Sequence, residues 1–306
     1  MPKLFDNLDL ARKELDHPRC AISEALEDQW QKYEQYADNN YRADLNKCVT
    51  DLAECAEDDV HTQAKCLDKF MQRFWELHIA MSLLDIPVTL LKRDERDKAG
   101  PDSIFKSGDT LCYVEAIVPN AGEGADRVPD LEFGGVHSVP DLEIQLRYTS
   151  ALYTKLLQRN KRAKAGVIDE SCPYFVAING SRIPSAKLDY DPPRIARCLF
   201  GIGPPAVGIN TQTMEWGEWF LKSRETLPRK LADDIPANAF LDKEFNKISG
   251  VLFSTADPWN FYGSFSNQII LVENPNADIP APIELTEHFG RWTYSDCQIV
   301  WHEPSR

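Results

Sequence analysis

A two-stranded hairpin is the element that this chain specifies most clearly. Ile104 and Phe105 are followed by Lys-Ser-Gly-Asp and then by the apolar run of residues 110–118. Two such runs around a short loop that contains glycine are typical of an antiparallel hairpin. A hairpin brings the beginning of its first strand towards the end of its second. We therefore expect Asp102 and Glu115 to be neighbours.

Three carboxylates occupy key positions around this hairpin. Glu115 lies in Cys-Tyr-Val-Glu-Ala-Ile-Val, an apolar run of the kind that forms a buried strand. A buried carboxylate is costly unless it is paired, protonated or bound to a metal ion. Asp102 precedes the first hairpin strand, and Glu76 lies at the edge of the apolar face of a helix predicted from Thr62 to just before Pro87. The alternative is that each acid is a solvated edge residue or a salt-bridge partner.

The order of these residues resembles the PD-(D/E)xK nuclease superfamily. Its helix glutamate, its Asp after Pro and its strand motif correspond here to Glu76, Asp102 and Glu115-Ala-Ile117. The resemblance implies a restriction-endonuclease-like αβββαβ core with a mixed central sheet, and Mg²⁺ or Mn²⁺ held by Glu76, Asp102 and Glu115. It also implies hydrolysis of phosphodiester bonds in DNA or RNA, or in some smaller phosphorylated substrate. Ile117 stands where the superfamily has its lysine, so either another residue supplies that cation or the chain is an inactive nuclease-fold protein that acts as a binding or interaction module.

A basic helix after the hairpin offers a substitute for the missing lysine. Residues 143–165 predict this helix and contain six basic residues. Arg147, Lys155 and Gln158 fall near one of its faces, because they are separated by whole helical turns. In the superfamily this helix packs beside the active site, which implies Lys155 as the catalytic lysine and Arg147, Gln145 and Gln158 as groups that contact the substrate or its water. The alternative is a helix face that is simply solvated.

The whole chain is expected to be an α/β protein with one core and two extensions. Residues 62–185 form the nuclease-like core, since a buried strand at 172–180 follows the basic helix and should run parallel to a hairpin strand. Residues 1–61 predict a helical N-terminal extension. Residues 186–306 predict a strand-rich α+β extension that packs on the core sheet and includes an aromatic hairpin within 206–230.

The charge distribution bears on the partners of the protein. The formal net charge is -14 over 306 residues, which counts against general binding of nucleic acid by the whole surface. A local basic strip on the predicted 143–165 helix is nevertheless compatible with a phosphate backbone. The N-terminal helices carry half of the net negative charge, so they are either a docking face for a protein partner or a solvated cap on the core.

Composition indicates the compartment. No apolar run approaches the roughly 18 to 20 residues of a membrane-spanning helix, and the acidic N-terminal segment is unlike a signal peptide. The eight cysteines follow no framework spacing, so we expect reduced thiols in a cytoplasmic protein.

Two loops carry open alternatives. Residues 120–140 are rich in Gly, Asp and Pro and include His137, which suggests either a lid or binding loop or a disordered insertion. The loop with Trp259, Phe261, Tyr262 and Phe265 offers rings that either stack on bases or cover an edge of the core.

Overall fold

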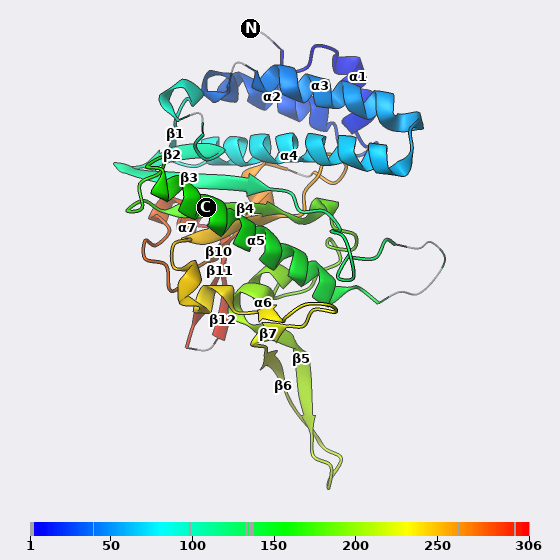
Figure 1. Cartoon of the computed structure of the whole chain (residues 1–306), viewed down its shortest axis with the longest axis vertical. Coiled ribbons are helices and arrows are strands. Elements are labelled where there is room, and N and C mark those ends of the chain that lie inside the picture. The colour runs from blue at the N-terminus through cyan, green and yellow to red at the C-terminus, as the bar shows by residue number, and fades with distance from the viewer. Residues whose placement is uncertain are drawn as a thin grey trace.

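A mixed sheet of eight strands lies at the centre of the computed structural model, which describes residues 3–38, 40–97, 99–131, 134, 138–261, 263–296 and 298–305. The strand order is β1-β2-β3-β4-β9-β10-β11-β12 (Figure 1). The strands are β1 (Thr89–Leu90), β2 (Ser103–Ser107), β3 (Thr110–Ile117), β4 (Tyr174–Asn179), β9 (Gly250–Ser254), β10 (Ile270–Glu273), β11 (Gly290–Ser295) and β12 (Gln298–His302). The helices are α1 (Leu8–Leu15), α2 (Ile22–Tyr33), α3 (Tyr41–Glu54), α4 (Val60–Leu84), α5 (Asp141–Lys164), α6 (Arg194–Phe200) and α7 (Ile283–His288).

The predicted hairpin and crossover are both confirmed. β2 pairs antiparallel with β3, with Ser103 opposite Val114. β3 then pairs parallel with β4, with Glu115 beside Val176, and α5 makes the connection between them. Together with β1, which is antiparallel to β2, the chain runs α4-β1-β2-β3-α5-β4 through this half of the sheet. The fold class is therefore mixed α/β, as the sequence predicts.

The two long helices cover opposite faces of the sheet. Because successive residues of a strand alternate between faces, Val114 and Ala116 of β3 join the core under α4, whereas Tyr113 joins the core under α5. Acidic residues in the first turn of α5 and basic residues in its last turn favour that helix through the backbone dipole. Glu115 lies two residues after Tyr113 and therefore on the same face of β3, so its side chain is directed towards α5.

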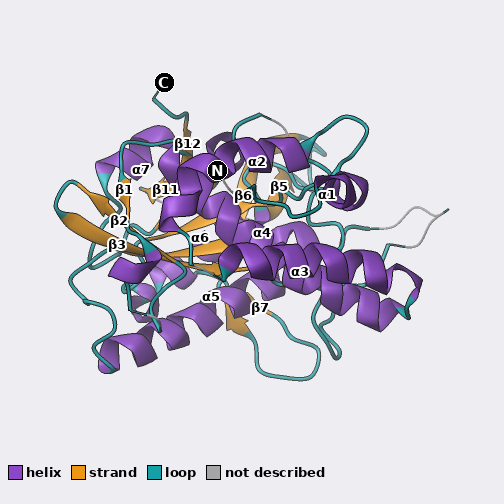
Figure 2. Cartoon of the chain, turned by 90° about the horizontal axis from the view of Figure 1, so that it is seen from above, coloured by secondary structure: helices purple, strands orange, loops and turns teal. Residues whose placement is uncertain are grey.

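Helix α4 is buried between the sheet and the N-terminal helices. It begins slightly earlier than predicted, at Val60, because the Asp59 side chain accepts hydrogen bonds from the amides of His61 and Thr62 at 2.9 and 3.2 Å. Helices α1, α2 and α3 lie over its outer side (Figure 2). Their apolar residues join the same core as the sheet residues below α4. The helical N-terminal segment is thus an added layer on that core.

The prediction that all cysteines are reduced is wrong for one pair. Cys55 and Cys66 form a disulfide across the turn between α3 and α4, with their Cα atoms 6.9 Å apart. The two helices run side by side, which brings the thiols within reach although their spacing matches no disulfide framework. Among the residues that the structure describes, five other cysteines are free, of which Cys48, Cys112 and Cys198 are buried.

The C-terminal segment extends the sheet as predicted. β9 adds parallel to β4, and β10 to β12 continue to the far edge. Phe261 and Phe265 are buried against the α4 side of the core, so these two aromatic residues cover a core edge. Tyr262 and His137 lie outside the described residues. No helix in the described ranges is long and apolar enough to cross a membrane.

A separate two-stranded arm projects from the C-terminal half. It consists of β5 (Ile202–Ile209) and β6 (Trp216–Ser223), which pair antiparallel. A shorter ribbon of β7 (Thr226–Leu227) and β8 (Ile235–Pro236) follows it. Figure 1 shows that the arm extends away from the central sheet. The arm is the aromatic hairpin that the sequence predicts.

Candidate active site

The hairpin register places Asp102 beside Glu115. Asp102 immediately precedes Ser103, whose partner Val114 immediately precedes Glu115. The Asp102 Oδ2 atom accepts a hydrogen bond of 2.8 Å from the amide of Ala116. This bond holds the Asp102 carboxylate against β3, as the hairpin geometry predicts.

Glu115 is a buried carboxylate with two cationic partners on α5. It is 2 % exposed. Lys155 Nζ donates to its Oε1 at 2.9 Å, and Arg162 Nη1 donates to its Oε2. Lys155 Nζ also donates to Gln158 Oε1 at 3.3 Å. Lys155, Gln158 and Arg162 lie at intervals of three and four residues, so they share the face of α5 that covers β3.

Glu76 lies at the other side of the hairpin strand, on α4. Its Oε1 accepts from Gln72 Nε2 at 3.0 Å and its Oε2 accepts from Arg73 Nη1 at 2.7 Å. The same Gln72 side chain accepts a hydrogen bond of 3.2 Å from the amide of Val118. Gln72 therefore ties Glu76 to the end of β3.

Glu76 and Asp102 face a common cavity of about 370 Å³ beneath the N-terminal helices. Tyr33 at the end of α2 and Tyr41 at the start of α3 form part of its wall. Four arginines and four acids line it: Arg73, Arg93, Arg96, Arg162, Asp38, Asp44, Glu76 and Asp102. The lining therefore carries many charged groups, and its positive and negative charges nearly cancel.

The three carboxylates influence one another electrostatically. The pKa of Asp102 is raised to about 7, first by burial and then by the negative charges of Glu115 and Glu76, although the Ala116 amide and Lys155 oppose that rise. Like charges at close range make ionisation of one carboxyl group unfavourable. The negative charge of Asp102 is therefore only partly offset by the groups around it.

The donor chemistry of the site fits a hard divalent cation in part. Carboxylate oxygens are the preferred ligands of Mg²⁺, and the raised pKa of Asp102 marks a negative charge that a cation would stabilise. Both oxygens of Glu115 and both of Glu76 already accept hydrogen bonds. Within the described ranges, no three His, Cys, Asp or Glu side chains gather closely enough to hold a metal ion. A metal would therefore require the carboxylates to move closer together and Glu76 or Glu115 to release a present partner.

Two of the predicted substrate-binding residues lie apart from this cluster. Gln145 precedes Lys155 by ten residues, which is about 15 Å along a helix. It is fully buried, where it donates to Asp141 and accepts from Arg224 at 3.2 Å. Arg147 donates from Nε to the Asn120 carbonyl at 2.9 Å. Gln145 therefore belongs to a buried polar network with Asp141 and Arg224. Arg147 fixes the position of the loop after β3 through its bond to Asn120.

Sequence reasoning did not single out two arginines that complete the site. Arg162 follows Lys155 by two helical turns, and its Nε also donates to the Ala99 carbonyl at 2.8 Å, close to Asp102 in the chain. Arg96 donates from Nη1 to the Asp102 carbonyl at 2.8 Å. The spacing of Arg162 from Lys155 is a usable signal, whereas Arg96 lies in a turn with no periodic pattern.

Comparison with known proteins identifies no relative of this chain. No family model, no curated protein and no solved structure matches the chain.

Proposed function

We propose that this protein is a metal-dependent nuclease that hydrolyses phosphodiester bonds of DNA or RNA. The observation that carries the proposal is the contact between Lys155 and Glu115, 2.9 Å from Nζ to Oε1. This contact places the ammonium group of Lys155 beside Glu115. On β3 itself, Ile117 occupies the position at which the superfamily has its lysine. The path α4-β1-β2-β3-α5-β4, with β4 parallel to β3, supports a restriction-endonuclease-like core.

The proposal assigns a role to each side chain. Asp102 would hold the metal, with Glu76 and Glu115 completing the carboxylate set. The bound ion would lower the pKa of a water molecule and offset negative charge on the phosphate. Lys155 would orient that water, with Gln158 positioning the Lys155 ammonium group through their 3.3 Å contact.

The arginines of the cavity support an anionic substrate. Arg73, Arg93, Arg96 and Arg162 all line it, and guanidinium groups match phosphate geometry. Arg73 and Arg162 now pair with Glu76 and Glu115. Transfer of these guanidinium groups to phosphate oxygens would free one oxygen of each carboxylate for the metal, so substrate and metal binding are expected to be cooperative.

The test is a cleavage assay with end-labelled single-stranded DNA, duplex DNA and RNA, in Mg²⁺ or Mn²⁺. The wild-type protein should cleave at least one of them, and Asp102→Ala should not. Lys155→Ala should lower the rate by about 10² to 10⁴, the range of general acid–base contributions. Lys161→Ala is the matched control, because Lys161 is an exposed lysine of the same helix. Equal activity of the Lys155 and Lys161 variants would contradict the assignment of Lys155.

A second candidate function is a nuclease-fold binding module without catalysis. It is favoured by the double ion pair of Glu115, which leaves that carboxylate neutralised by Lys155 and Arg162. Calorimetric titration of Mn²⁺ in the presence of a non-cleavable phosphorothioate oligonucleotide separates the two. Metal uptake that Asp102→Ala abolishes supports the nuclease, and oligonucleotide binding that is independent of metal supports the module.

A further inference from the structure

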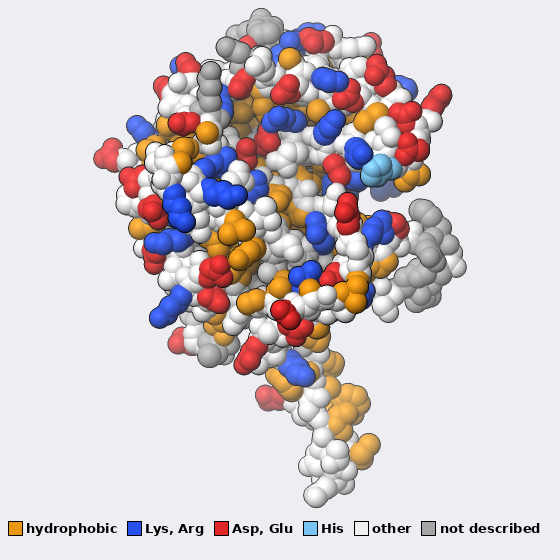
Figure 3. Space-filling view, in the orientation of Figure 1, with side chains coloured by type: hydrophobic (Ala, Val, Ile, Leu, Met, Phe, Trp, Pro, Cys, Tyr) orange, Lys and Arg blue, Asp and Glu red, His pale blue; other side chains and the backbone are white. Residues whose placement is uncertain are grey.

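The β5–β6 arm exposes an unusual amount of apolar surface. Trp216 and Trp219 are each 71 % exposed, and all eight residues of β6 are exposed. Orange side chains gather along this arm in the space-filling view (Figure 3). A lone two-stranded hairpin is only marginally stable in water. A partner that covers this apolar surface would therefore stabilise the arm.

The exposed area corresponds to one side of a dimer interface. Aromatic side chains present about 150–250 Å² each when fully accessible, so the two tryptophans together offer roughly 350 Å² at their exposed fractions. Other large apolar side chains of the arm are also exposed, namely Ile209, Met214, Phe220 and Leu221. At comparable areas per side chain, they bring the total over both strands of the arm to roughly 700 Å². A standard interface takes about 800 Å² from each partner.

The charges of the arm favour a second copy of this chain as the partner. Residues 202–223 contain only Glu215, Glu218 and Lys222 as charged groups. Such a surface offers too little positive charge to grip a phosphate backbone. It is instead complementary to itself, because an antiparallel pairing of two β6 strands centred on Phe220 brings Glu218 of each arm, which lies at the register irregularity between Trp216 and Trp219, near Lys222 of the other. Opposite charges in such cross-strand pairs are stabilising.

The free edge of β6 permits this pairing. Among the described strands β6 pairs only with β5, which leaves the backbone groups of its outer edge open to a further strand. An antiparallel pair of identical strands has two-fold symmetry, and two-fold dimers are the commonest closed assemblies. In the same pairing, Trp219 of each arm lies opposite Leu221 of the other on one face of the sheet.

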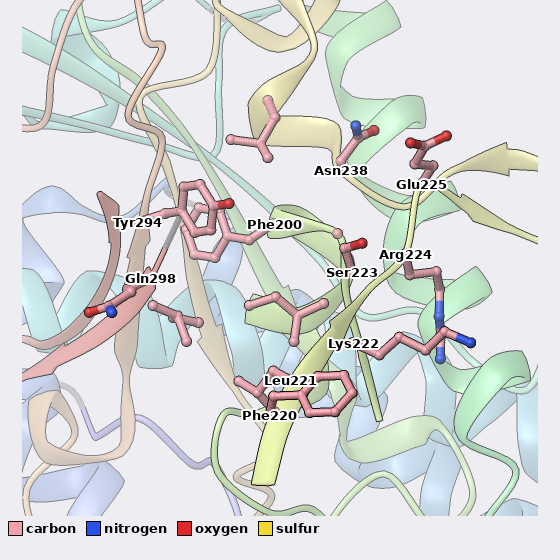
Figure 4. A pocket seen from close by; sticks show the side chains of 14 residues that line it. Phe200, Phe220, Leu221, Lys222, Ser223, Arg224, Glu225, Asn238, Tyr294 and Gln298 are labelled. Carbon is pink, nitrogen blue, oxygen red and sulfur yellow. The ribbon is translucent and has the colours of Figure 1, made fainter. Parts of the chain in front are cut away.

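A hollow at the base of the arm is placed to receive the tip of a second arm. It has a volume of about 570 Å³ and is lined partly by the stacked rings of Phe200 and Tyr294 and by Ile299 (Figure 4). In an antiparallel arrangement the tip of one arm, with Met214 and Trp216, lies at the base of the other. The same chain therefore carries both the protruding group and the hollow.

We propose that the protein forms a two-fold dimer through antiparallel pairing of β6 edges, with each arm tip seated in the hollow of the other copy. Sedimentation velocity of the full chain at about 20 µM should give twice the 34.8 kDa chain mass. Trp219→Glu should give the single-chain mass. Leu231→Glu is the control, because Leu231 is 86 % exposed but lies outside the arm, and this variant should stay dimeric.

Charge reversal tests the pairing itself. Glu218→Lys alone and Lys222→Glu alone each place like charges together and should weaken the dimer by about tenfold in Kd. The double reversal should return the Kd to near the wild-type value. Both residues are exposed, so these variants should fold even if Trp219→Glu does not. A monomeric wild type, a dimer unaffected by the arm variants, or no recovery in the double variant would each overturn the proposal. Quenching of arm tryptophan fluorescence by an oligonucleotide, with the wild type monomeric, would reassign the arm to nucleic-acid contact.

Discussion

Lys155 Nζ on α5 and Glu115 Oε1 on β3 form a 2.9 Å ion pair between residues separated by 40 positions in the chain. The lysine side chain is 13 % exposed and the glutamate side chain 3 % exposed. A buried pair of this kind leaves a costly charge behind when one partner is removed. The pair therefore has consequences for stability as well as for the proposed chemistry.

Replacement of Lys155 should destabilise the protein. In Lys155→Ala, Glu115 keeps only Arg162 as a cationic partner, so the free energy of unfolding should fall by about 1–3 kcal/mol. Urea denaturation followed by circular dichroism measures the change. Lys161→Ala, on the exposed side of α5, should change it by less than about 0.5 kcal/mol. Equal effects of the two variants would show that the ion pair contributes nothing.

A lysine introduced at the position of Ile117 should separate catalytic from structural roles of Lys155. Ile117 follows Glu115 by two residues on the same strand, so its side chain lies on the same face of the sheet. The double variant Lys155→Ala/Ile117→Lys should regain roughly tenfold in cleavage rate over Lys155→Ala. Lys155→Ala/Ile117→Met, which keeps an apolar side chain there, should regain nothing. If both double variants are equally inactive, the position of the cation is not what limits the reaction.

Local patterns predicted the hairpin and the crossover because each depends on short-range signals. The glycine turn sets the register of β2 and β3 and hence the contact of Asp102 with Ala116. A single crossover helix of the right length then places Lys155 over Glu115. These are the parts of the candidate site that the sequence predicts.

The rest of the site depends on distances that helical periodicity does not encode. α5 has 24 residues and is about 36 Å long, so residues on one face can serve different neighbours. Arg147 and Lys155 are an example, because Arg147 donates to the Asn120 carbonyl whereas Lys155 reaches Glu115 on β3. Tyr33 and Tyr41 reach the cavity because α2 and α3 pack over α4, and nothing in their local sequence indicates that packing.

The disulfide between Cys55 and Cys66 should stabilise the helical layer. It closes a loop with a sequence separation of 11, for which constraint of the unfolded chain contributes about 2–3 kcal/mol. Cys55→Ser/Cys66→Ser should lower the free energy of unfolding by that amount under non-reducing conditions. Reductant should remove the difference between this variant and the wild type. Cys48→Ser replaces a free cysteine of α3. In this variant, reductant should lower the free energy of unfolding as it does in the wild type.

Stability should depend on pH through Asp102. Its carboxyl group has a pKa of about 7 in the folded protein, against about 3.9 in an unfolded chain. Between these values the folded state holds a proton that the unfolded state has released. The free energy of unfolding should therefore fall as pH rises from about 4 to about 7, and then level off. The charged Asp102 carboxylate is thus destabilising at neutral pH.

Asp102→Asn should remove this dependence while keeping an oxygen acceptor for the Ala116 amide. The variant should match the wild type near pH 4 and exceed it at pH 8 by on the order of 2 kcal/mol, which corresponds to a rise of a few degrees in Tm. Asp44→Asn, at an acid of the same cavity whose side chain is 53 % exposed, should leave the pH profile unchanged. Mg²⁺ at pH 8 should raise the Tm of the wild type and not that of Asp102→Asn, because the ion stabilises the same charge. A wild-type Tm that does not fall from pH 4 to 7 relative to the Tm of Asp102→Asn would contradict the burial of Asp102 close to Glu115 and Glu76.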